Sequence, residues 1–439
     1  MQSRMKERMK KGLVICVAGV TAFTAAACGA DQDPVQNLVE EEKADGKIVN
    51  LFGSMEKSDP DADNIARNAF DMTIVEAENA FDVTVEYRTY TAENYQEKTY
   101  DDVVLERARH DMDDLYLLNP DTIQILGAEG KLADLSGLES AKNLRDVVKV
   151  SNTVNGKLVA IPQEVVVYGL FVNKEMFDQY ELELPDTPKE LMECCRVFKE
   201  NGIETPIGAN RWWLENFVFA IGYADLYNGG DTEAEVEALN SGESKYSDYM
   251  REGFEYLQEM IDKGYIDAET AYTSEAIEGE GADFLAQKTP IVMAYWGAAN
   301  TETAYGKTDF EMQVIGFPSS RGQMPVVAMS GYGVNRDGEH FEDTMDVLDY
   351  ILSDESLQLY AETNQVISPS KKVQVDCVPA LKPLNDKVNE NVYVLGSNAS
   401  MKLEQWGNTC LLVRELLNGS TVDECMAELD RLQEETLNK

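Results

Sequence analysis

A nearly uncharged run, residues 158–173 in the stretch GKLVAIPQEVVVYGLFVNKEMF, places the strongest constraint on the fold of this chain. Its one charged side chain is Glu164, and Pro162 interrupts it near its start. Proline cannot donate to a sheet ladder, so the run predicts a short strand before the break and a second, buried strand over residues 165–172. The preceding Asn-Gly pair predicts a tight turn. Two strands separated by a break indicate a segment that passes from one sheet to another.

The rest of the chain alternates strand and helix patterns. Residues 47–52 and 81–87 are β-branched and aromatic runs, and Phe70 and Ile74 stand between them at helical spacing. This is the pattern of a βαβ unit, and a second such unit over residues 93–118 ends in a strand. The alternation predicts an α/β fold. Further helices are expected from Thr187 to Gly202 and over residues 245–263, 341–361 and 409–436.

The N-terminus has the pattern of an export signal. A basic segment precedes an apolar run of roughly 16 residues, which is short for a membrane span. The sequence from Ala25 to Gly29 resembles a bacterial lipobox, in which Cys28 is acylated, although Ala25 stands where leucine is preferred. We therefore expect a lipoprotein signal peptide over residues 1–27 and an acidic tether over residues 28–45. Ordinary cleavage, which would release a free secreted protein, stays open.

The net charge of the chain restricts the kinds of partner that it can bind. Without residues 1–27 the chain has 33 Lys and Arg and 79 Asp and Glu, a net charge of −46. Such a surface repels nucleic acid and anionic lipid. Solubility alone is the simpler explanation of this charge, and a cationic ligand is the alternative.

The cysteines and histidines give no sign of a metal site or a catalytic site. Five cysteines remain after Cys28, which is an odd number, and none has metal-ligand spacing, so we expect small core residues. His110 and His340 are the two histidines, too few for a multi-histidine zinc site. No phosphate-binding loop or nucleophile elbow is present, and the calcium-loop-like start at Asp59 fails at Asn64 and Phe70. We expect no enzyme activity, no metal and no cofactor, although carboxylate pairs for glycoside hydrolysis stay possible among so many acids.

Ordered blocks of sequence from about residue 45 onward resemble the family 1 extracellular solute-binding proteins. These are the carbohydrate-type receptors of ATP-binding-cassette (ABC) importers, and the family includes maltose-binding protein. The blocks that carry the resemblance are GKLVAIP at 156–162, FVNKEMF at 171–177, LPDTPKEL at 184–191, GIETP at 202–206, PIVMAYWG at 290–297, IGFP at 315–318, GYGVN at 331–335 and LNGSTVDE at 417–424.

The resemblance implies two α/β lobes with the ligand in the cleft between them. Each lobe is expected to contain a mainly parallel sheet flanked by helices, and hinge segments cross between the lobes. The length of the chain also favours two domains. We expect the first lobe to comprise residues 46–165 and 312–338, and the second lobe residues 166–311 and 339–439. The uncharged run is then the first crossing, and Glu164 is either a cleft residue or a solvated turn residue.

The resemblance also directs attention to aromatic side chains, because a sugar offers apolar C–H faces to flat rings. The candidates for ligand contact are Trp296, one of Trp212 and Trp213, Trp406, and Tyr332 between two glycines. Core packing is the alternative for each. Polar candidates are Ser54, Glu56 and Lys57 after the first strand, and Asp113 and Asp114 beside a later one. Each of these could instead be a cap or a solvated loop residue.

The function implied by the resemblance is reception of a sugar or oligosaccharide for an ABC permease. The expected partners are a small-molecule ligand, the membrane subunits of the transporter, and the membrane through a lipid on Cys28; a monomer outside the cell membrane is expected, with no nucleic acid. The alternative is a receptor for a polyamine or another cation, or a sensory binding lipoprotein. Stacking tryptophans with neutral partners would favour a sugar, and converging carboxylates without them would favour a cation.

Overall fold

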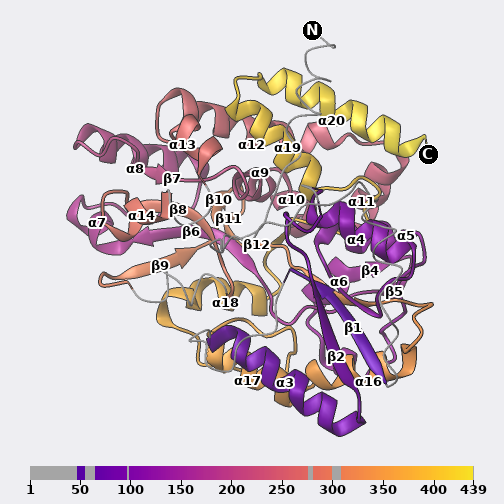
Figure 1. Cartoon of the computed structure of the whole chain (residues 1–439). Helices are drawn as coiled ribbons and strands as arrows, with labels where there is room; N and C mark the ends of the chain where they lie inside the picture. The colour runs from indigo at the N-terminus through magenta and orange to yellow at the C-terminus, as the bar shows by residue number, and fades with distance from the viewer. Residues whose placement is uncertain (1–46, 55–64, 96–97, 275–279, 299–307, 439) are drawn as a thin grey trace, which may run out of the picture.

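The computed structural model describes residues 47–54, 65–95, 98–274, 280–298 and 308–438. This part of the chain contains a four-stranded and a six-stranded sheet, each flanked by helices (Figure 1), so the α/β class is confirmed. The first sheet has the strand order β13-β3-β1-β2. Its strands are β1 (Ile48–Gly53), β2 (Thr84–Thr89), β3 (Leu115–Leu118) and β13 (Gly331–Val334).

The first sheet is mainly parallel, as expected. β1 is parallel to both β2 and β3, and β13 is antiparallel to β3. The predicted strands near residues 47–52 and 114–118 correspond to β1 and β3. The strand expected over residues 81–87 begins later, at Thr84, because helix α3 (Ile65–Phe81) continues to Phe81 and Asp82 then turns the chain with a φ of 53°.

The second sheet is mixed rather than mainly parallel. Its central strand β6 is antiparallel to β8, β9 and β12, whereas β7 is parallel to β8 and β14 is parallel to β12. The strands are β6 (Val167–Asn173), β7 (Ile207–Gly208), β8 (Ile291–Trp296), β9 (Met312–Ile315), β12 (Val326–Val327) and β14 (Val394–Leu395). A hairpin of β10 (Phe317–Ser319) and β11 (Gly322–Met324) follows β9.

The uncharged run passes from the first sheet to the second, as its sequence predicts. It begins in β5 (Lys157–Leu158), which forms a small hairpin with β4 (Thr153–Val154) through a turn at Asn155 and Gly156, both with positive φ. Ile161 then bridges to Tyr332 in β13, and the chain enters the second sheet as β6. The run is therefore a connection between the lobes.

The expected boundaries of the lobes need correction after the first crossing. β9 at residues 312–315 pairs with β6, so the chain is still in the second sheet at residue 312, and it reaches the first sheet only at β13. Helices α16 (Phe341–Ile351) and α17 (Asp354–Asn364) then pack against α3, so the chain has not left the first lobe at residue 339. It returns to the second lobe before α18, which packs on β9.

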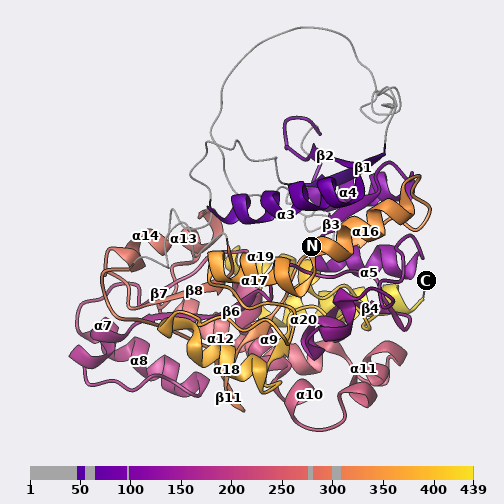
Figure 2. The same cartoon turned by 90° about the horizontal axis from the view of Figure 1, so that it is seen from below.

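Helices cover both sheets. In the first lobe they are α3, α4 (Tyr100–Arg109), α5 (Pro120–Ala128), the 3₁₀ helix η1 (Ser140–Asn143), α6 (Asp146–Asn152), α16 and α17. In the second lobe they are α7 (Lys174–Gln179), α8 (Pro188–Glu200), α9 (Leu214–Gly222), α10 (Ala224–Asn228), α11 (Thr232–Ser241), α12 (Tyr246–Asp262), α13 (Ala268–Thr273), α14 (Glu280–Leu285), η4 (Pro379–Leu381), α18 (Lys382–Asn389), α19 (Trp406–Leu417) and α20 (Val422–Leu437). Figure 2 shows α3 and α8 on opposite sides of the molecule.

Local capping explains where the predicted helices begin and end. α8 starts with a capping box between Thr187 and Glu190, and Gly202, with a φ of 93°, lies just beyond its end. The helix expected over residues 341–361 is divided into α16 and α17, because the hydroxyl of Ser353 caps a new helix start. The helix expected over residues 409–436 is likewise divided, and a capping box at Thr421 starts α20.

Candidate functional site

The carboxyl end of β3 brings polar side chains toward the second lobe. Asn119 and Asp121 follow β3 directly and lie at the start of α5, whose first residue is a proline. The amide of Asn119 donates to Asp101 Oδ1 at 2.9 Å, and the Ser330 hydroxyl donates to Asn119 Oδ1 at 3.0 Å. In open α/β sheets ligands bind outside the carboxyl ends of the strands. These residues are therefore placed where a ligand-binding lobe presents its polar groups.

Asp121 reaches across to the second lobe. Its Oδ2 accepts the backbone N–H of Gly407 at 2.7 Å, at the N-terminus of α19. A carboxylate is favoured there by the orphan N–H groups and the helix dipole. Its other oxygen, Oδ1, is buried and has no hydrogen-bond partner among the described residues. Asp121 is therefore an acceptor with unused capacity at the interface between the lobes.

The carboxylates at this interface hold their protons more tightly than usual. Burial raises the pKa of Asp121 to about 7, the charges of Glu404 and Asp101 add to the rise, and the hydrogen bond from Gly407 opposes it. Burial likewise raises the pKa of Asp101 to about 6, against the hydrogen bond from Asn119. Perturbed carboxylates in contact with one another are typical of functional sites, although ion networks can also produce them.

Four aromatic rings of the second lobe form a continuous group, which we call the aromatic row. Its members are Trp213, Tyr295, Tyr168 and Trp406, with successive ring centroids 5.4, 5.5 and 5.4 Å apart. Tyr295 and Trp406 are partly exposed, whereas the other two are nearly buried. The rings come from separate parts of the chain, namely the start of α9, β8, β6 and the start of α19. The row ends at Trp406, next to the Asp121–Gly407 contact.

Glu164 of the crossing run lies beside Tyr295, the second ring of the aromatic row. Its Oε2 accepts the backbone N–H of Ala298 at 2.9 Å. Burial raises the pKa of Glu164 to about 7. Burial, with a contribution from the charge of Glu164, raises the pKa of Tyr295 to about 12. Glu164 is therefore a largely buried acceptor beside an aromatic ring, and its role as a cleft residue stays a prediction.

The two adjacent tryptophans take different environments. Trp213 belongs to the aromatic row, whereas Trp212 packs against the guanidinium groups of Arg211 and Arg414, whose Cζ atoms lie 4.8 and 4.9 Å from its ring centroid. Two cation–π contacts therefore hold the Trp212 ring in place.

Two of the aromatic candidates are core residues. Trp296 is 1% exposed, donates its indole N–H to the Gln365 carbonyl and packs against Phe171. Successive strand residues point to opposite faces, so Tyr295, and not its neighbour Trp296, belongs to the aromatic row. Tyr332 is 3% exposed and stacks on Phe70 in the first lobe. Neither side chain is available to a ligand in this structure.

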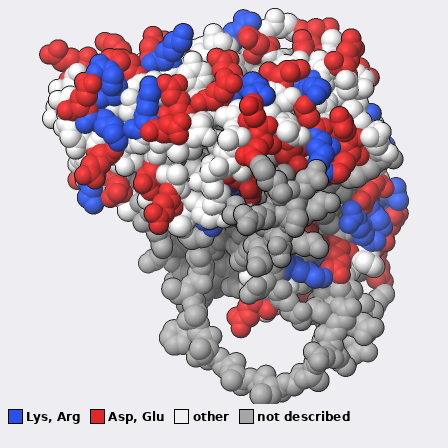
Figure 3. Space-filling model, turned by 90° about the horizontal axis from the view of Figure 1, so that it is seen from above, with Lys and Arg blue, Asp and Glu red and all other residues white. Residues whose placement is uncertain are grey.

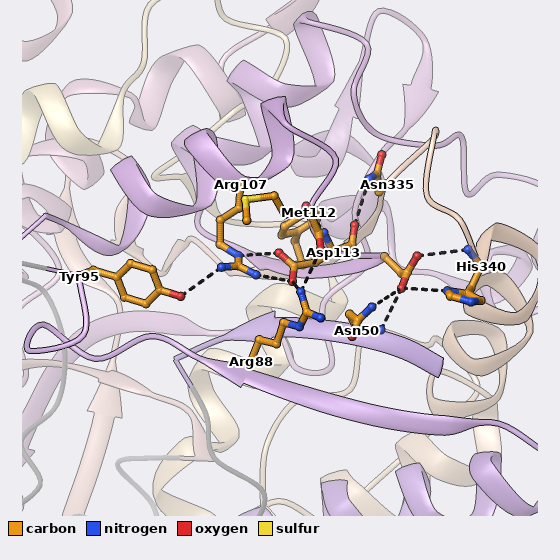
Figure 4. Close-up of polar contacts among 10 residues, drawn as sticks. Asn50, Arg88, Tyr95, Arg107, Met112, Asp113, Asn335 and His340 are labelled. Carbon is orange, nitrogen blue, oxygen red and sulfur yellow. Dashed lines mark hydrogen bonds and ion pairs between the residues drawn. The ribbon is translucent and has the colours of Figure 1, made fainter. Parts of the chain in front are cut away.

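Asp113 and Asp114 are structural carboxylates, which corrects their assignment as ligand contacts. They lie at the amino end of β3, the opposite end from Asn119. Figure 4 shows Arg107 and Arg88 directed at Asp113, with Arg107 forming two contacts of 2.7 Å. Asp114 accepts the backbone and side-chain N–H groups of Asn50 and the backbone N–H of His340. Their oxygens are engaged in holding β3 to its neighbours.

The remaining sequence candidates are placed as follows. Ser54 is exposed at the carboxyl end of β1. Glu56 and Lys57, the signal peptide, Cys28 and the acidic tether lie outside the described residues.

Comparison with known proteins identifies the class to which this arrangement belongs. Residues 62–358 match the family of bacterial extracellular solute-binding proteins. The chain belongs to this family. No curated relative matches the sequence at a significant level.

Solved structures share the fold of this solute-binding protein. A chitin oligosaccharide binding protein superposes with a TM-score of 0.72 at 16% identity, over 90% of this chain and all of its own (100%). The apo form of RafE from Streptococcus pneumoniae superposes with a TM-score of 0.66 at 14% identity, over 90% of this chain and 100% of its own. A family 1 extracellular solute-binding protein from Bifidobacterium longum subsp. infantis superposes with a TM-score of 0.67 at 16% identity, over 88% of this chain and 99% of its own. At these identities the likeness shows the two-lobed fold.

Sequence reasoning missed several residues of the site in this solute-binding protein. Tyr295 could have been found from the alternation along the strand before Gly297, and Asp121 from its position just after the strand that ends at Leu118. Tyr168, Asp101 and Glu404 carry no local signal, because only the tertiary fold brings them to the interface.

The described residues include neither a metal-binding cluster nor a membrane-spanning helix. No group of three or more His, Cys, Asp or Glu side chains there is arranged to hold a metal ion. No helix in the same residues has the length and apolar composition required to cross a membrane.

Proposed function

We propose that this protein is an extracytoplasmic receptor that binds a sugar or oligosaccharide between its lobes and delivers it to an ABC importer. The observation that carries the proposal is the aromatic row of the second lobe, which ends against the carboxylate Asp121 of the first lobe. A sugar needs aromatic faces for its C–H surfaces and acceptor oxygens for its hydroxyl groups. Both are present where the lobes meet.

Structural relatives support the same class of ligand. One of the similar structures is described as a chitin oligosaccharide binding protein, and another is RafE in complex with raffinose. The aromatic row gives this inference an independent physical basis in the present chain.

The mechanism we propose is closure of two lobes on the ligand. The connections between them are short: the uncharged run, the segment between β12 and β13, and the segment after α17, where Val165 bridges to Ile367. Rotation about such connections changes the distance between Asp121 and the aromatic row. A ligand that touches both lobes stabilises the closed state by its differential affinity for that state. The closed form is then the species that the transporter recognises.

The proposed location of the protein is the outer face of the cell membrane. Lipid on Cys28 would anchor the protein at the outer face of the cell membrane, and the tether at residues 28–45 would leave the lobes free to reach the permease, raising their local concentration there. The protein acts as a monomer without cofactor or catalytic step.

A receptor for a polyamine or another cation is the second candidate, with delivery to a permease or to a membrane sensor. Asp101, Asp121 and Glu404 lie close enough together to raise the pKa of Asp121, which is the convergence of carboxylates expected for a cation. The aromatic row beside them favours the sugar.

The test is thermal melting of residues 29–439 with mono- and oligosaccharides and, separately, with polyamines. A ligand that binds only the folded state raises the melting temperature by mass action. A rise with a sugar, lost in Trp406→Ala, supports the proposal. A rise with polyamines alone replaces it with the second candidate.

A further inference from the structure

In the described part of the chain, three carboxylates near the aromatic row have no Lys or Arg to balance their charge. Asp101, Asp121 and Glu164 accept hydrogen bonds from neutral donors, namely the Asn119 amide and the backbone N–H groups of Gly407 and Ala298. Within the described residues no Lys or Arg lies within ion-pair distance of these three carboxylates. Asp113 shows the contrast, because it is nearly buried between Arg88 and Arg107. Burial of an ionised carboxylate without a countercharge is expensive, so such a group either holds a proton or gains from the arrival of a cation.

Two carboxylates flank the three rings that run from Tyr295 through Tyr168 to Trp406. Glu164 lies beside Tyr295, and Asp121 accepts the backbone N–H of Gly407, the residue after Trp406. Asp121 has one oxygen without a hydrogen-bond partner in the described part of the chain. A ligand lying along the row would therefore present one end to each carboxylate, with its flat faces on the rings between them.

We infer that the ligand is a cationic carbohydrate, an oligosaccharide with ammonium groups on at least two of its sugar rings. This inference rests on the proposed function and names its substrate class. Ammonium groups supply donors to Asp121 and Glu164 and also the missing positive charge, whereas neutral hydroxyl groups supply donors alone. The aromatic faces take the C–H surfaces of the rings, and cation–π attraction adds to this. A neutral sugar can stack on the aromatic rings, but it supplies no positive charge to the carboxylates.

Three trisaccharides with the same β-1,4-linked glucose backbone isolate the charge. They carry an ammonium group, an acetamido group or a hydroxyl group at C2: the glucosamine trimer, the N-acetylglucosamine trimer and cellotriose. Titration calorimetry of the mature chain should give at least about tenfold tighter binding for the glucosamine trimer, because hydrogen bonds between charged groups are about twice as strong as neutral ones. The difference should shrink at high salt, since partly exposed charges are screened. Monomeric glucosamine should lose most of this difference, because it carries one ammonium group for two carboxylates.

Variants distinguish charge recognition from general damage. Asp121→Asn and Glu164→Gln keep the shape and the acceptor oxygen, so they should reduce the preference for the glucosamine trimer while leaving the neutral trimers nearly unchanged. Trp406→Ala should weaken all three trimers together. Glu233→Gln, an exposed residue of α11, is the matched control and should change none of them. Unchanged far-ultraviolet circular dichroism and ligand-free melting would show that each variant is folded.

The outcomes separate this inference from the function on which it rests. Equal or tighter binding of a neutral trimer, or of any neutral sugar in the melting panel, overturns the cationic preference and leaves the sugar receptor standing. Binding of spermidine without any sugar overturns both in favour of the cation receptor. Absence of binding by any sugar overturns both as well.

Discussion

Trp296, at the end of β8 in the second sheet, donates its indole N–H to the carbonyl oxygen of Gln365, which caps α17 in the first lobe, at 2.9 Å. The largest of the buried side chains therefore connects the two lobes. Its position next to the bridge between Val165 and Ile367 makes it part of the hinge, while its neighbour Tyr295 lies in the aromatic row.

Replacing Trp296 tests this division of roles. Trp296→Ala should lower the free energy of unfolding by about 3–5 kcal/mol, because it leaves a large cavity in a packed core. Chemical unfolding followed by circular dichroism measures the loss. Trp296→Phe should cost less and should leave the choice of ligand unchanged. A Trp296→Ala protein of unaltered stability that no longer binds ligand would place Trp296 in the site instead.

The aromatic row should carry the affinity for sugar. Trp406→Ala should weaken binding by at least about tenfold, because stacked aromatic contacts add about 0.5–1.5 kcal/mol to the free energy of burying their area. Tyr295→Phe keeps the ring and should change affinity only slightly, whereas Tyr295→Ala should behave like Trp406→Ala. Titration calorimetry measures the affinity of each variant for the sugar that raises the melting temperature of the parent protein. Equal effects of Tyr295→Phe and Tyr295→Ala would show that the hydroxyl group, and not the ring face, makes the contact.

The network around Asp113 should affect stability and leave ligand binding intact. Asp113→Asn leaves the Arg107 side chain, which is 2% exposed, without its charge partner, and a broken buried pair costs about 3–5 kcal/mol. Asp337→Asn is the matched control, because its ion pair with Arg336 is exposed and such pairs contribute about 0–1 kcal/mol. Chemical unfolding compares the two. Loss of ligand affinity in folded Asp113→Asn would contradict the structural role.

The pH dependence of stability follows from the raised pKa values of Asp121 and Glu164. Both are about 7 in the folded protein, against ordinary values of 3.8 and 4.5. Between these limits the folded protein binds more protons than the unfolded chain, so these groups favour folding at low pH and lose that contribution as pH rises toward 7. The ligand-free melting temperature of Asp121→Asn should therefore rise relative to the parent from pH 5 to pH 8. A constant difference would show that Asp121 is not perturbed.

Much of the fold was predictable from local sequence signals. The break at Pro162 between two apolar strands predicted the crossing, and the capping signal at Thr187 predicted the start of α8, because both depend on neighbours in the chain. The expected return of the chain to the first lobe, at residue 312, is too early, because the chain reaches the first sheet only at β13. β9 and β13 are similar short strands, and only their pairing with β6 or with β3 distinguishes the sheets.

The candidate site was less predictable. Tryptophan type alone could not separate Trp296, on the buried face of β8, from Tyr295 on the other face. Acidic residues beside a strand could not be ranked as ligand contacts without knowing which end of the strand faces the other lobe. Asp113 and Asp114 lie at the amino end of β3, and Asp121 follows its carboxyl end. The contact between Asp121 and Gly407 joins distant parts of the chain, and no local pattern marks such a pair.

The packing of α3 against α16 and α17 has a consequence for biosynthesis. Phe70, Ile74 and Ala77 on α3 belong to the core, yet the helices that cover α3 are made only after most of the second lobe. A chain emerging from its N-terminus therefore carries an incomplete first lobe, with this apolar surface uncovered, until residue 364 is available. The first lobe is begun first and finished late, which delays stable folding of the nascent chain.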